Sequence, residues 1–231
     1  MAERMKGLLP LAAAVGILAF LWTWAALDFS FHWVSSGDLG NGLDLPSNFQ
    51  LIVPAAFVSW AMYFAAGGDN TAAGKVAIAN VFGAVAALIV MWGTPLIADL
   101  PDFWGIALGV GVLAAVLVVL GALGDWFFIP GTFGAFASVF FFWIATGLDN
   151  WAPNGGGVGN SVKALGNPAT AGAGAFGGVI STPYGWVFVS ILATLTIGVG
   201  LGMLSTRLAA LFTPKPRAVA AEAPPRESAV A

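Results

Sequence analysis

Long apolar runs, separated by short polar segments, constrain this chain more than any other feature. Apolar residues make up 59% of the 231 residues and charged residues only 8%, whereas an ordinary soluble domain carries about 25% charged residues. A helix needs about 20 apolar residues to cross the hydrocarbon core of a bilayer. Six segments come close to that length and predict an all-α, polytopic membrane protein with six transmembrane helices: 8–27, 51–66, 76–97, 104–123, 127–146 and 184–212.

The composition also excludes several classes of function. The chain has no cysteine and one histidine, His32, which excludes disulfides, iron–sulfur clusters and thiolate or multi-histidine metal sites within one chain. No span interior holds two ionisable groups, although intramembrane proteolysis, proton pumping and redox work usually need them. The chain also lacks the basic patch typical of nucleic-acid binding. We therefore expect no enzyme activity, no cofactor, no metal and no nucleic-acid partner.

Positive charge predicts the orientation of the spans, because Lys and Arg concentrate in cytoplasmic loops. With six spans and a cytoplasmic N-terminus, seven of the eight basic residues fall inside and only Lys163 falls outside. The sequence therefore predicts that both termini are cytoplasmic. The alternative for the first segment is a cleaved signal peptide, since Arg4 and Lys6 form a basic N-terminal region. Its long apolar run, with Trp22 and Trp24, favours a span.

We expect a single transmembrane domain over residues 1–213, with two outer (periplasmic) loops at 28–50 and 147–183. His32 in the first loop titrates near neutrality when unperturbed, which leaves a pH-sensing role open beside that of a plain loop residue. The second loop contains a small, apolar, Gly- and Ala-rich stretch at 168–180, which favours either a plain loop or a re-entrant segment covered by protein.

Two further segments carry no site. Gly172, Gly174 and Gly177 form the pattern GxGxxG, but without a preceding strand this pattern reflects composition and not a dinucleotide site. Residues 214–231 are rich in Pro and Ala, and we expect a disordered cytoplasmic tail.

The second and fifth segments share a local pattern. Each begins with an apolar residue and a proline (Pro54, Pro130), has a phenylalanine three residues later (Phe57, Phe133), and ends with glycine and Asp-Asn, although the Pro-to-Asn spacings differ by four residues, about one helical turn. With six spans the two segments cross in opposite directions, so the pattern predicts an inverted 3+3 repeat, as found in many transporters. The alternative is that these residues only mark helix ends, because Pro favours a helix start and Gly with Asp-Asn favours a helix end in any protein. The predicted repeat ends are Asp69, Asn70, Asp149 and Asn150.

Mild polar and aromatic groups in the spans are the candidate pore lining. An amide in a span needs hydrogen-bond partners, so Asn80 either fixes helix packing or lines a path for a polar solute. The aromatic candidates have a similar alternative as core or lipid-facing residues. The predicted pore-lining set is Phe57, Ser59, Trp60, Tyr63, Asn80, Thr132, Phe133 and Trp143.

Glycine is abundant, with 31 residues, and small residues let membrane helices approach closely. The pairs Gly105/Gly109 and Gly198/Gly202 have the small-xxx-small spacing. We expect them to form packing faces within the chain, or between chains in a homo-oligomer or a membrane complex.

Three short motifs occur in a recognisable order along the chain. They are Gly16-Ile17-Leu18 followed by Trp22-x-Trp24-x-Ala26, then Tyr63-Phe64-Ala65 before two glycines, then Pro130-Gly131-Thr132-Phe133. In this order they resemble the YcdZ-type small bacterial inner-membrane proteins, a family of unknown function. The resemblance covers 16–28, 52–147 and 184–211, while the residues around 29–50 and 151–183 and the tail are additional. It implies a bacterial inner (plasma) membrane location and no particular substrate.

Two hypotheses of function remain. The first is a passive channel or transporter for a small neutral or weakly charged solute, which the inverted repeat, the glycine content and the mild polar groups favour. The second is a non-catalytic membrane scaffold or accessory subunit that binds partner proteins or pigments through its glycine faces and outer loops.

Overall fold

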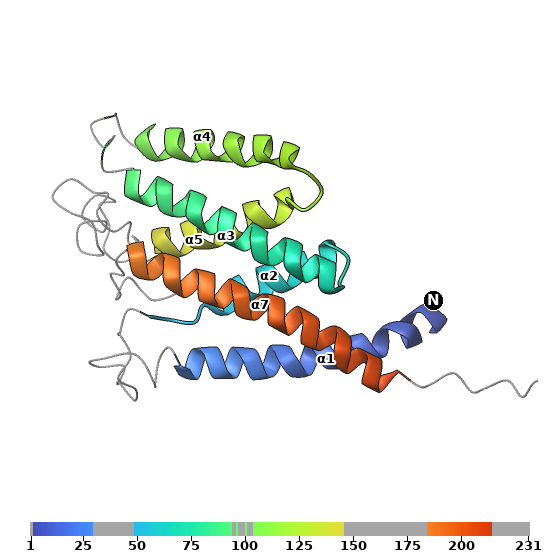
Figure 1. Ribbon diagram of the computed structural model, residues 1–231. Helices are drawn as coiled ribbons and strands as arrows, with labels where there is room; N and C mark the ends of the chain where they lie inside the picture. Colours follow the sequence, from blue (N-terminus) through green and yellow to red (C-terminus); the bar gives the residue numbers. More distant parts are fainter. Residues whose placement is uncertain are drawn as a thin grey trace, which may run out of the picture.

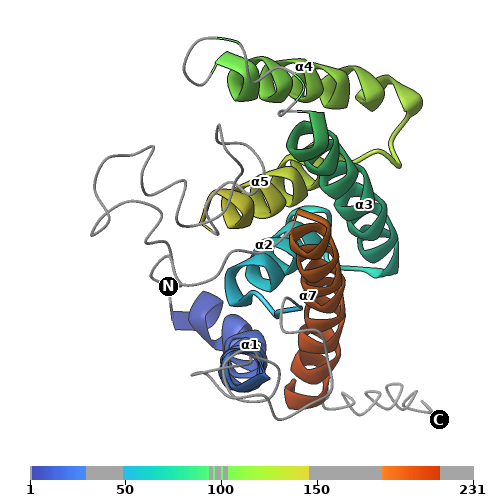
Figure 2. The ribbon, with the colours of Figure 1, turned by 90° about the vertical axis from the view of Figure 1, so that its left-hand side faces the viewer.

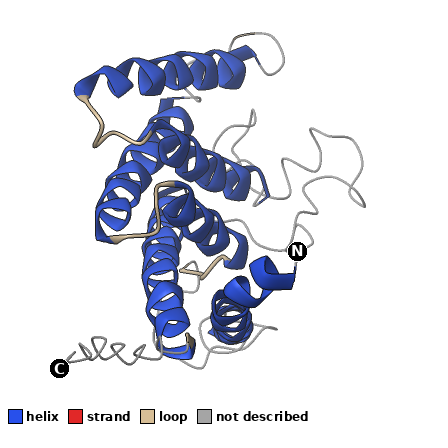
Figure 3. Cartoon of the chain, turned by 90° about the vertical axis from the view of Figure 1, so that its right-hand side faces the viewer, coloured by secondary structure: helices blue, strands red, loops and turns tan. Residues whose placement is uncertain are grey.

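The computed structural model describes residues 2–29, 49–93, 96, 100, 104–145 and 184–213, and all of the longer elements in this part of the chain are helices (Figure 3). The predicted all-α class is therefore confirmed for the described residues. The helices are α1 (Ala2–Asp28), α2 (Val53–Ala65), α3 (Asn70–Gly93), α4 (Trp104–Leu120), the short 3₁₀ turn η4 (Gly121–Leu123), α5 (Ile129–Ala145) and α7 (Tyr184–Phe212).

Four of these helices are long and apolar enough to cross a membrane: Arg4–Asp28, Asn70–Gly93, Trp104–Leu123 and Tyr184–Phe212. The chain is therefore a multi-pass membrane protein by helix length and composition. The two others are shorter. The 13 residues of α2 extend about 20 Å, against about 30 Å for the hydrocarbon core. The predicted six spans thus correspond to six helices, of which four have full span length.

The boundaries of α2 and α3 differ from the predicted segments for local reasons. Pro54 stands in the first turn of α2, where its missing N–H costs no hydrogen bond, and Ile52 before it is extended. The α3 helix begins at Asn70, six residues earlier than predicted, because the Asp69 carboxylate accepts a 2.7 Å hydrogen bond from the Ala72 N–H. This is an N-cap, which satisfies one of the free donors of the first turn.

The helices form a layered bundle in which α1 and α4 lie on opposite sides (Figure 1). Between them, α3 packs on α5 and α2 packs on α7, while α1 contacts α7 and α4 contacts α3. The turned view shows the same order, with α4 at one end and α1 at the other (Figure 2). The four inner helices, α2, α3, α5 and α7, therefore hold the buried centre.

The outer helices expose apolar side chains. Only 11% of the most apolar window of α4 is buried, against 50% for α3. An exposed face of this kind is stable in lipid and unfavourable in water. Lipid contact accounts for the exposed large residues of α4, which include Trp104, Leu108, Val112, Val116 and Val119.

Several predictions fall outside the described residues. They concern His32, the re-entrant stretch at 168–180, the repeat-end residues Asp149 and Asn150, Lys163, and the tail at 214–231. These predictions stay as they were made.

Candidate functional site

The centre of the bundle contains two helix interfaces with matching contacts. A Cβ placed on Gly83 of α3 would lie 2.8 Å from the Ala135 Cβ and would meet the Thr132 carbonyl of α5. A Cβ placed on Gly198 of α7 would lie 2.9 Å from the Ser59 Cβ and would meet the Ala56 carbonyl of α2. Only glycine permits such a close approach of two backbones.

The two contacts also match in sequence position. Ala56 and Ser59 follow Pro54 by two and five residues, and Thr132 and Ala135 follow Pro130 by the same intervals. The α2/α7 and α3/α5 interfaces therefore use equivalent positions of α2 and α5. The α2 helix runs opposite to α5 through the bundle, and α3 runs opposite to α7 (Figure 1).

Two further contacts each join two residues that stand at the same interval from the proline or the close-packed glycine of their helices. Val58 and Gly134 each lie four residues after the proline, and the Val58 Cγ1 lies 3.1 Å from a Cβ placed on Gly134. Asn80 and Leu195 each lie three residues before the close-packed glycine, and the Asn80 Nδ2 donates to the Leu195 carbonyl at 3.4 Å. In each of these two contacts, a residue of one helix meets the residue at the same interval in the other helix.

Buried polar side chains are concentrated on one of the two interfaces. Among the described residues, six of the seven buried polar side chains lie along α2 and α7 or contact them, and only Thr132 lies on α5. We call this set, together with the buried Trp60 and Tyr63, the polar seam. The six polar residues are Gln50, Ser59, Asn80, Ser190, Thr194 and Ser205.

Asn80 lies at the middle of the polar seam. Its Nδ2 donates a 2.9 Å hydrogen bond to the Ser59 Oγ on α2 in addition to the bond to Leu195 on α7. The amide therefore ties three helices together, as the packing alternative anticipates. Two of the predicted pore residues, Ser59 and Asn80, are thus brought into contact.

One end of the polar seam is formed by aromatic residues. The Trp60 Nε1 donates to the Ser205 Oγ at 3.1 Å, and the Tyr63 hydroxyl donates to the Gly68 carbonyl at 2.6 Å. The Tyr63 hydroxyl also lies 3.2 Å from the Thr206 Oγ1. Trp60 and Tyr63, both predicted as pore-lining, are 3% and 2% exposed, so they form part of the closed interface in this conformation.

The other end contains a short non-helical segment. The backbone N–H groups of Gln50 and Ile52 donate to the Ser190 Oγ at 3.1 Å and to the Thr194 Oγ1 at 3.2 Å. Buried backbone N–H groups outside a helix need an acceptor from elsewhere in the protein. The hydroxyls of α7 accept these two bonds, and α7 thereby holds the non-helical segment that precedes α2.

Of the remaining predicted pore residues, Phe57 stacks on Trp60 of the polar seam, with ring centroids 5.8 Å apart, and the other three lie on α5. The Thr132 hydroxyl donates to the Ile129 carbonyl of its own helix at 2.7 Å. Trp143 is fully buried in the apolar core beside Phe140, with a ring distance of 5.7 Å. Phe57 and Phe133 are 36% and 38% exposed. The pore-lining role of all eight residues stays a prediction.

The sequence patterns missed Gln50, Ser205 and Thr206. Gln50 lies at the end of a predicted loop, which removed it from consideration. For α7 a readable signal exists, since Ser190, Thr194, Gly198 and Gly202 follow at four-residue intervals and Ser205 comes next. Residues four apart share a helix face, so this pattern predicts one small and polar face along α7.

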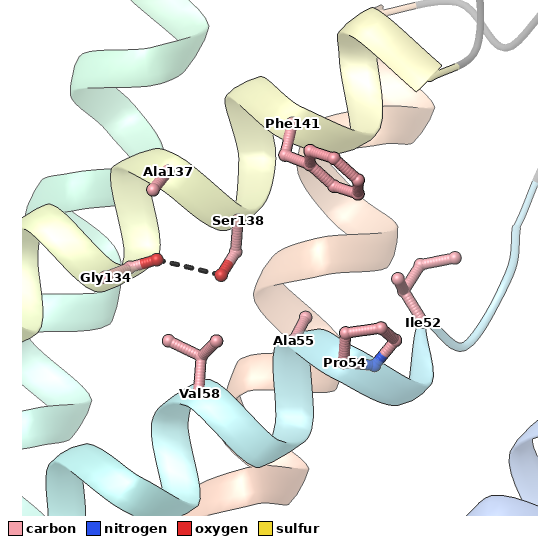
Figure 4. Close-up of a pocket in the computed structure, with 8 residues that line it drawn as sticks. All are labelled: Ile52, Pro54, Ala55, Val58, Gly134, Ala137, Ser138 and Phe141. Carbon is pink, nitrogen blue, oxygen red and sulfur yellow. Dashed lines mark hydrogen bonds between the residues drawn. The ribbon is translucent and has the colours of Figure 1, made fainter. Parts of the chain in front are cut away.

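An apolar groove lies on the surface between α2 and α5 (Figure 4). Its volume is about 420 Å³, and the Ser138 hydroxyl within it donates to the Gly134 carbonyl at 2.8 Å. The groove therefore offers little polar chemistry. Its lining consists of Ile52, Pro54, Ala55, Val58, Gly134, Ala137, Ser138 and Phe141.

The glycine pairs predicted as packing faces make contacts within the chain. A Cβ on Gly202 would meet the Tyr63 ring at 2.6 Å, and one on Gly109 would lie 3.5 Å from Val90 of α3. Gly105 is buried. These positions are therefore occupied by intramolecular packing.

Of the predicted repeat ends, Asp69 and Asn70 lie in the described part of the chain. We expect Asp69→Ala to lower the free energy of unfolding by about 1 kcal/mol, because the Ala72 N–H loses its cap. Asn70→Ala, at an exposed neighbouring position, is the control and should have little effect. Thermal unfolding of the purified variants measures both, and equal stability of the two would contradict the capping role.

The described residues contain no group of three or more His, Cys, Asp or Glu side chains that could hold a metal ion. No curated protein and no solved structure matches the chain. A family model does match, over residues 12–210, and so covers most of the chain. The chain, a multi-pass helical protein with a buried polar seam, belongs to the DUF1097 family of proteins of unknown function.

Proposed function

We propose that the protein is a passive channel or transporter for a small neutral or weakly charged polar solute, built as an inverted 3+3 repeat of six spans. The observation that carries the proposal is the matching pair of contacts, Gly83 on Thr132 and Gly198 on Ala56. Inverted repeats are typical of transporters, whose substrate path lies at the repeat interface.

The set of helix contacts supports the repeat. Exchanging α1 with α4, α2 with α5 and α3 with α7 converts α3/α5 into α2/α7, and α1/α7 into α3/α4. The same exchange relates α2/α3 to α5/α7 and α1/α2 to α4/α5, and leaves α2/α5 and α3/α7 unchanged. Together these pairs account for the principal contacts between helices. If Pro54 and Pro130 only marked helix starts, the helix contacts of the two halves would not be expected to correspond in this way.

The proposal includes a bacterial inner membrane location with both termini in the cytoplasm. The described basic residues support this orientation, because Arg4 and Lys6 lie at the start of α1, Lys75 near the start of α3 and Arg207 near the end of α7. These helix ends lie on the same side of the bundle (Figure 1). One basic side is what the positive-inside rule expects of the cytoplasmic face.

Passage is favoured over catalysis by the chemistry of the polar seam. Its side chains are hydroxyls, amides and aromatic N–H or O–H groups, and none of them belongs to Asp, Glu, His, Lys or Arg. Neutral groups of this kind can bind a neutral polar solute, and they include none of the imidazole, carboxylate, amine or thiol groups that most often act as general acids and bases.

A scaffold or accessory subunit is the second candidate. The observation that favours it is the exposure of α4, whose large apolar residues face outward along the helix. A partner helix can bind such a face as readily as lipid does. Gentle purification that retains a stoichiometric partner, together with no solute flux in liposomes, would favour this candidate over transport.

Uptake into proteoliposomes tests the proposed function. We expect the wild-type protein to accelerate entry of small neutral solutes such as urea and glycerol, followed by light scattering after a concentration step. Absence of acceleration for both solutes would contradict the proposal.

Asn80→Leu separates passage from packing in the same assay. Leucine already occupies the equivalent position 195, and we expect a stability loss of about 1–3 kcal/mol, because the buried Ser59 Oγ and Leu195 carbonyl lose their donor. We expect flux to fall by about tenfold, since a single hydrogen bond to the solute is lost. A variant that unfolds readily but transports at the wild-type rate while folded would assign Asn80 to packing alone.

A further inference from the structure

The two equivalent interfaces differ in chemistry although they share a geometry. Ser59 on α2 corresponds to Ala135 on α5, and Thr194 and Ser205 on α7 correspond to Ala79 and Val90 on α3. The apolar set is buried in the α3/α5 interface just as the polar set is buried in the α2/α7 interface. Close packing of the backbones therefore does not require the polar groups of the seam.

Gln50 adds an independent observation. It is 2% exposed, its backbone N–H is bonded to Ser190, and its side-chain Oε1 is buried without a hydrogen-bond partner. A buried acceptor left unpaired costs about 1–3 kcal/mol, and such a group in a folded protein calls for an explanation. Binding of a ligand donor by the Gln50 Oε1 is one explanation, and it fits the position of Gln50 at the end of the polar seam.

We propose that the Gln50 Oε1 is the acceptor of a binding site for a small neutral hydrogen-bond donor, located where the non-helical segment before α2 meets Ser190 and Thr194 of α7. The proposal rests on the proposed function, for which it names the outer binding position and the class of solute. No seam side chain carries a charge, so an ionic solute would lack a counter-charge and pay a large desolvation cost.

The site is closed in this conformation. The close contact of Gly198 with Ala56 and the burial of Gln50 leave the polar seam packed. Entry of a solute therefore requires α7 to separate from the start of α2. The hydrogen bonds from the Gln50 and Ile52 N–H groups to Ser190 and Thr194 join the two parts that such a motion would separate.

The chain offers a direct spectroscopic probe, because Gln50 is its only glutamine. Labelling glutamine with ¹³C at the side-chain carbonyl gives one signal in the full-length protein. We expect this signal to shift saturably when glycerol or urea is added. Saturation by glycerol alone assigns a hydroxyl donor, and saturation by urea alone assigns an N–H donor. No saturable shift with either solute would overturn the site and leave water as its occupant.

Flux measurements with Gln50→Leu complete the test. The variant removes the acceptor at similar side-chain volume, and we expect glycerol and urea flux to fall about tenfold, the loss expected for one hydrogen bond. Ser138→Ala in the apolar groove is the control and should keep its flux. A saturable shift without wild-type flux would uphold the site and contradict the proposed function. Unchanged flux in folded Gln50→Leu would overturn the site. If the leucine variant does not fold, the flux of Gln50→Asn, which keeps a side-chain carbonyl, is measured in its place.

Discussion

Gly198→Val is expected to lower the free energy of unfolding by about 3 kcal/mol or more, at the upper end of the range for overpacked sites. A Cβ at this position meets the backbone of Ala56 and lies 2.9 Å from the Ser59 Cβ. A backbone cannot rotate away as a flexible side chain can, so α7 must move off α2. Thermal unfolding in detergent, followed by tryptophan fluorescence, measures the loss.

The same helix and the same geometry supply controls. Gly200 has no atom within 4 Å of an added Cβ, so Gly200→Val should change the unfolding temperature little. Gly83→Val in the equivalent interface should be as destabilising as Gly198→Val, because its Cβ would meet the Thr132 backbone. A harmless Gly198→Val, or a large difference between the Gly83 and Gly198 variants, would argue against equivalent interfaces.

Trp143→Ala is expected to cost about 3–5 kcal/mol, the range for a large aromatic side chain deleted from a packed core. Trp143 has no exposed surface and lies in the cluster that joins α3, α5 and α7. Trp92→Ala is the control, since Trp92 is 61% exposed on α3. The measurement is thermal unfolding, combined with solute flux in liposomes.

The flux readout decides between two roles of Trp143. A core residue loses stability on truncation, and its flux falls only as folded protein is lost. A residue that narrows a pore would instead raise the flux per folded molecule when it is truncated to alanine. Higher flux at unchanged stability would therefore contradict the core assignment and restore the pore-lining prediction for this residue.

Local signals predicted the helices well where composition alone decides them. The predicted segment 184–212 has the observed bounds of α7, and 104–123 matches α4 with its terminal turn. The start of α2 was less predictable, because Leu51 and Ile52 are apolar in sequence but lie outside the helix in the structure. Their conformation depends on hydroxyls of α7, which lie about 140 positions away in the chain.

The candidate site was predictable only in its centre. Asn80 stands out because an amide in an apolar run demands partners, and the structure provides Ser59 and Leu195. The pairing of Trp60 with Ser205 spans 145 positions, and no local pattern contains such a contact. Gln50 was missed for the same reason, since its burial follows from tertiary packing against α7.

The dependence of α2 on α7 has a consequence for how the protein is made. The N–H groups of Gln50 and Ile52 bond to Ser190 and Thr194, which the ribosome adds about 140 residues later. A buried backbone donor without a partner is costly, so the start of α2 cannot adopt its final position before α7 is present. Among the described helices, α7 is synthesised last and supplies the acceptors for the segment before α2, so this part of the bundle is completed only after α7 has been made.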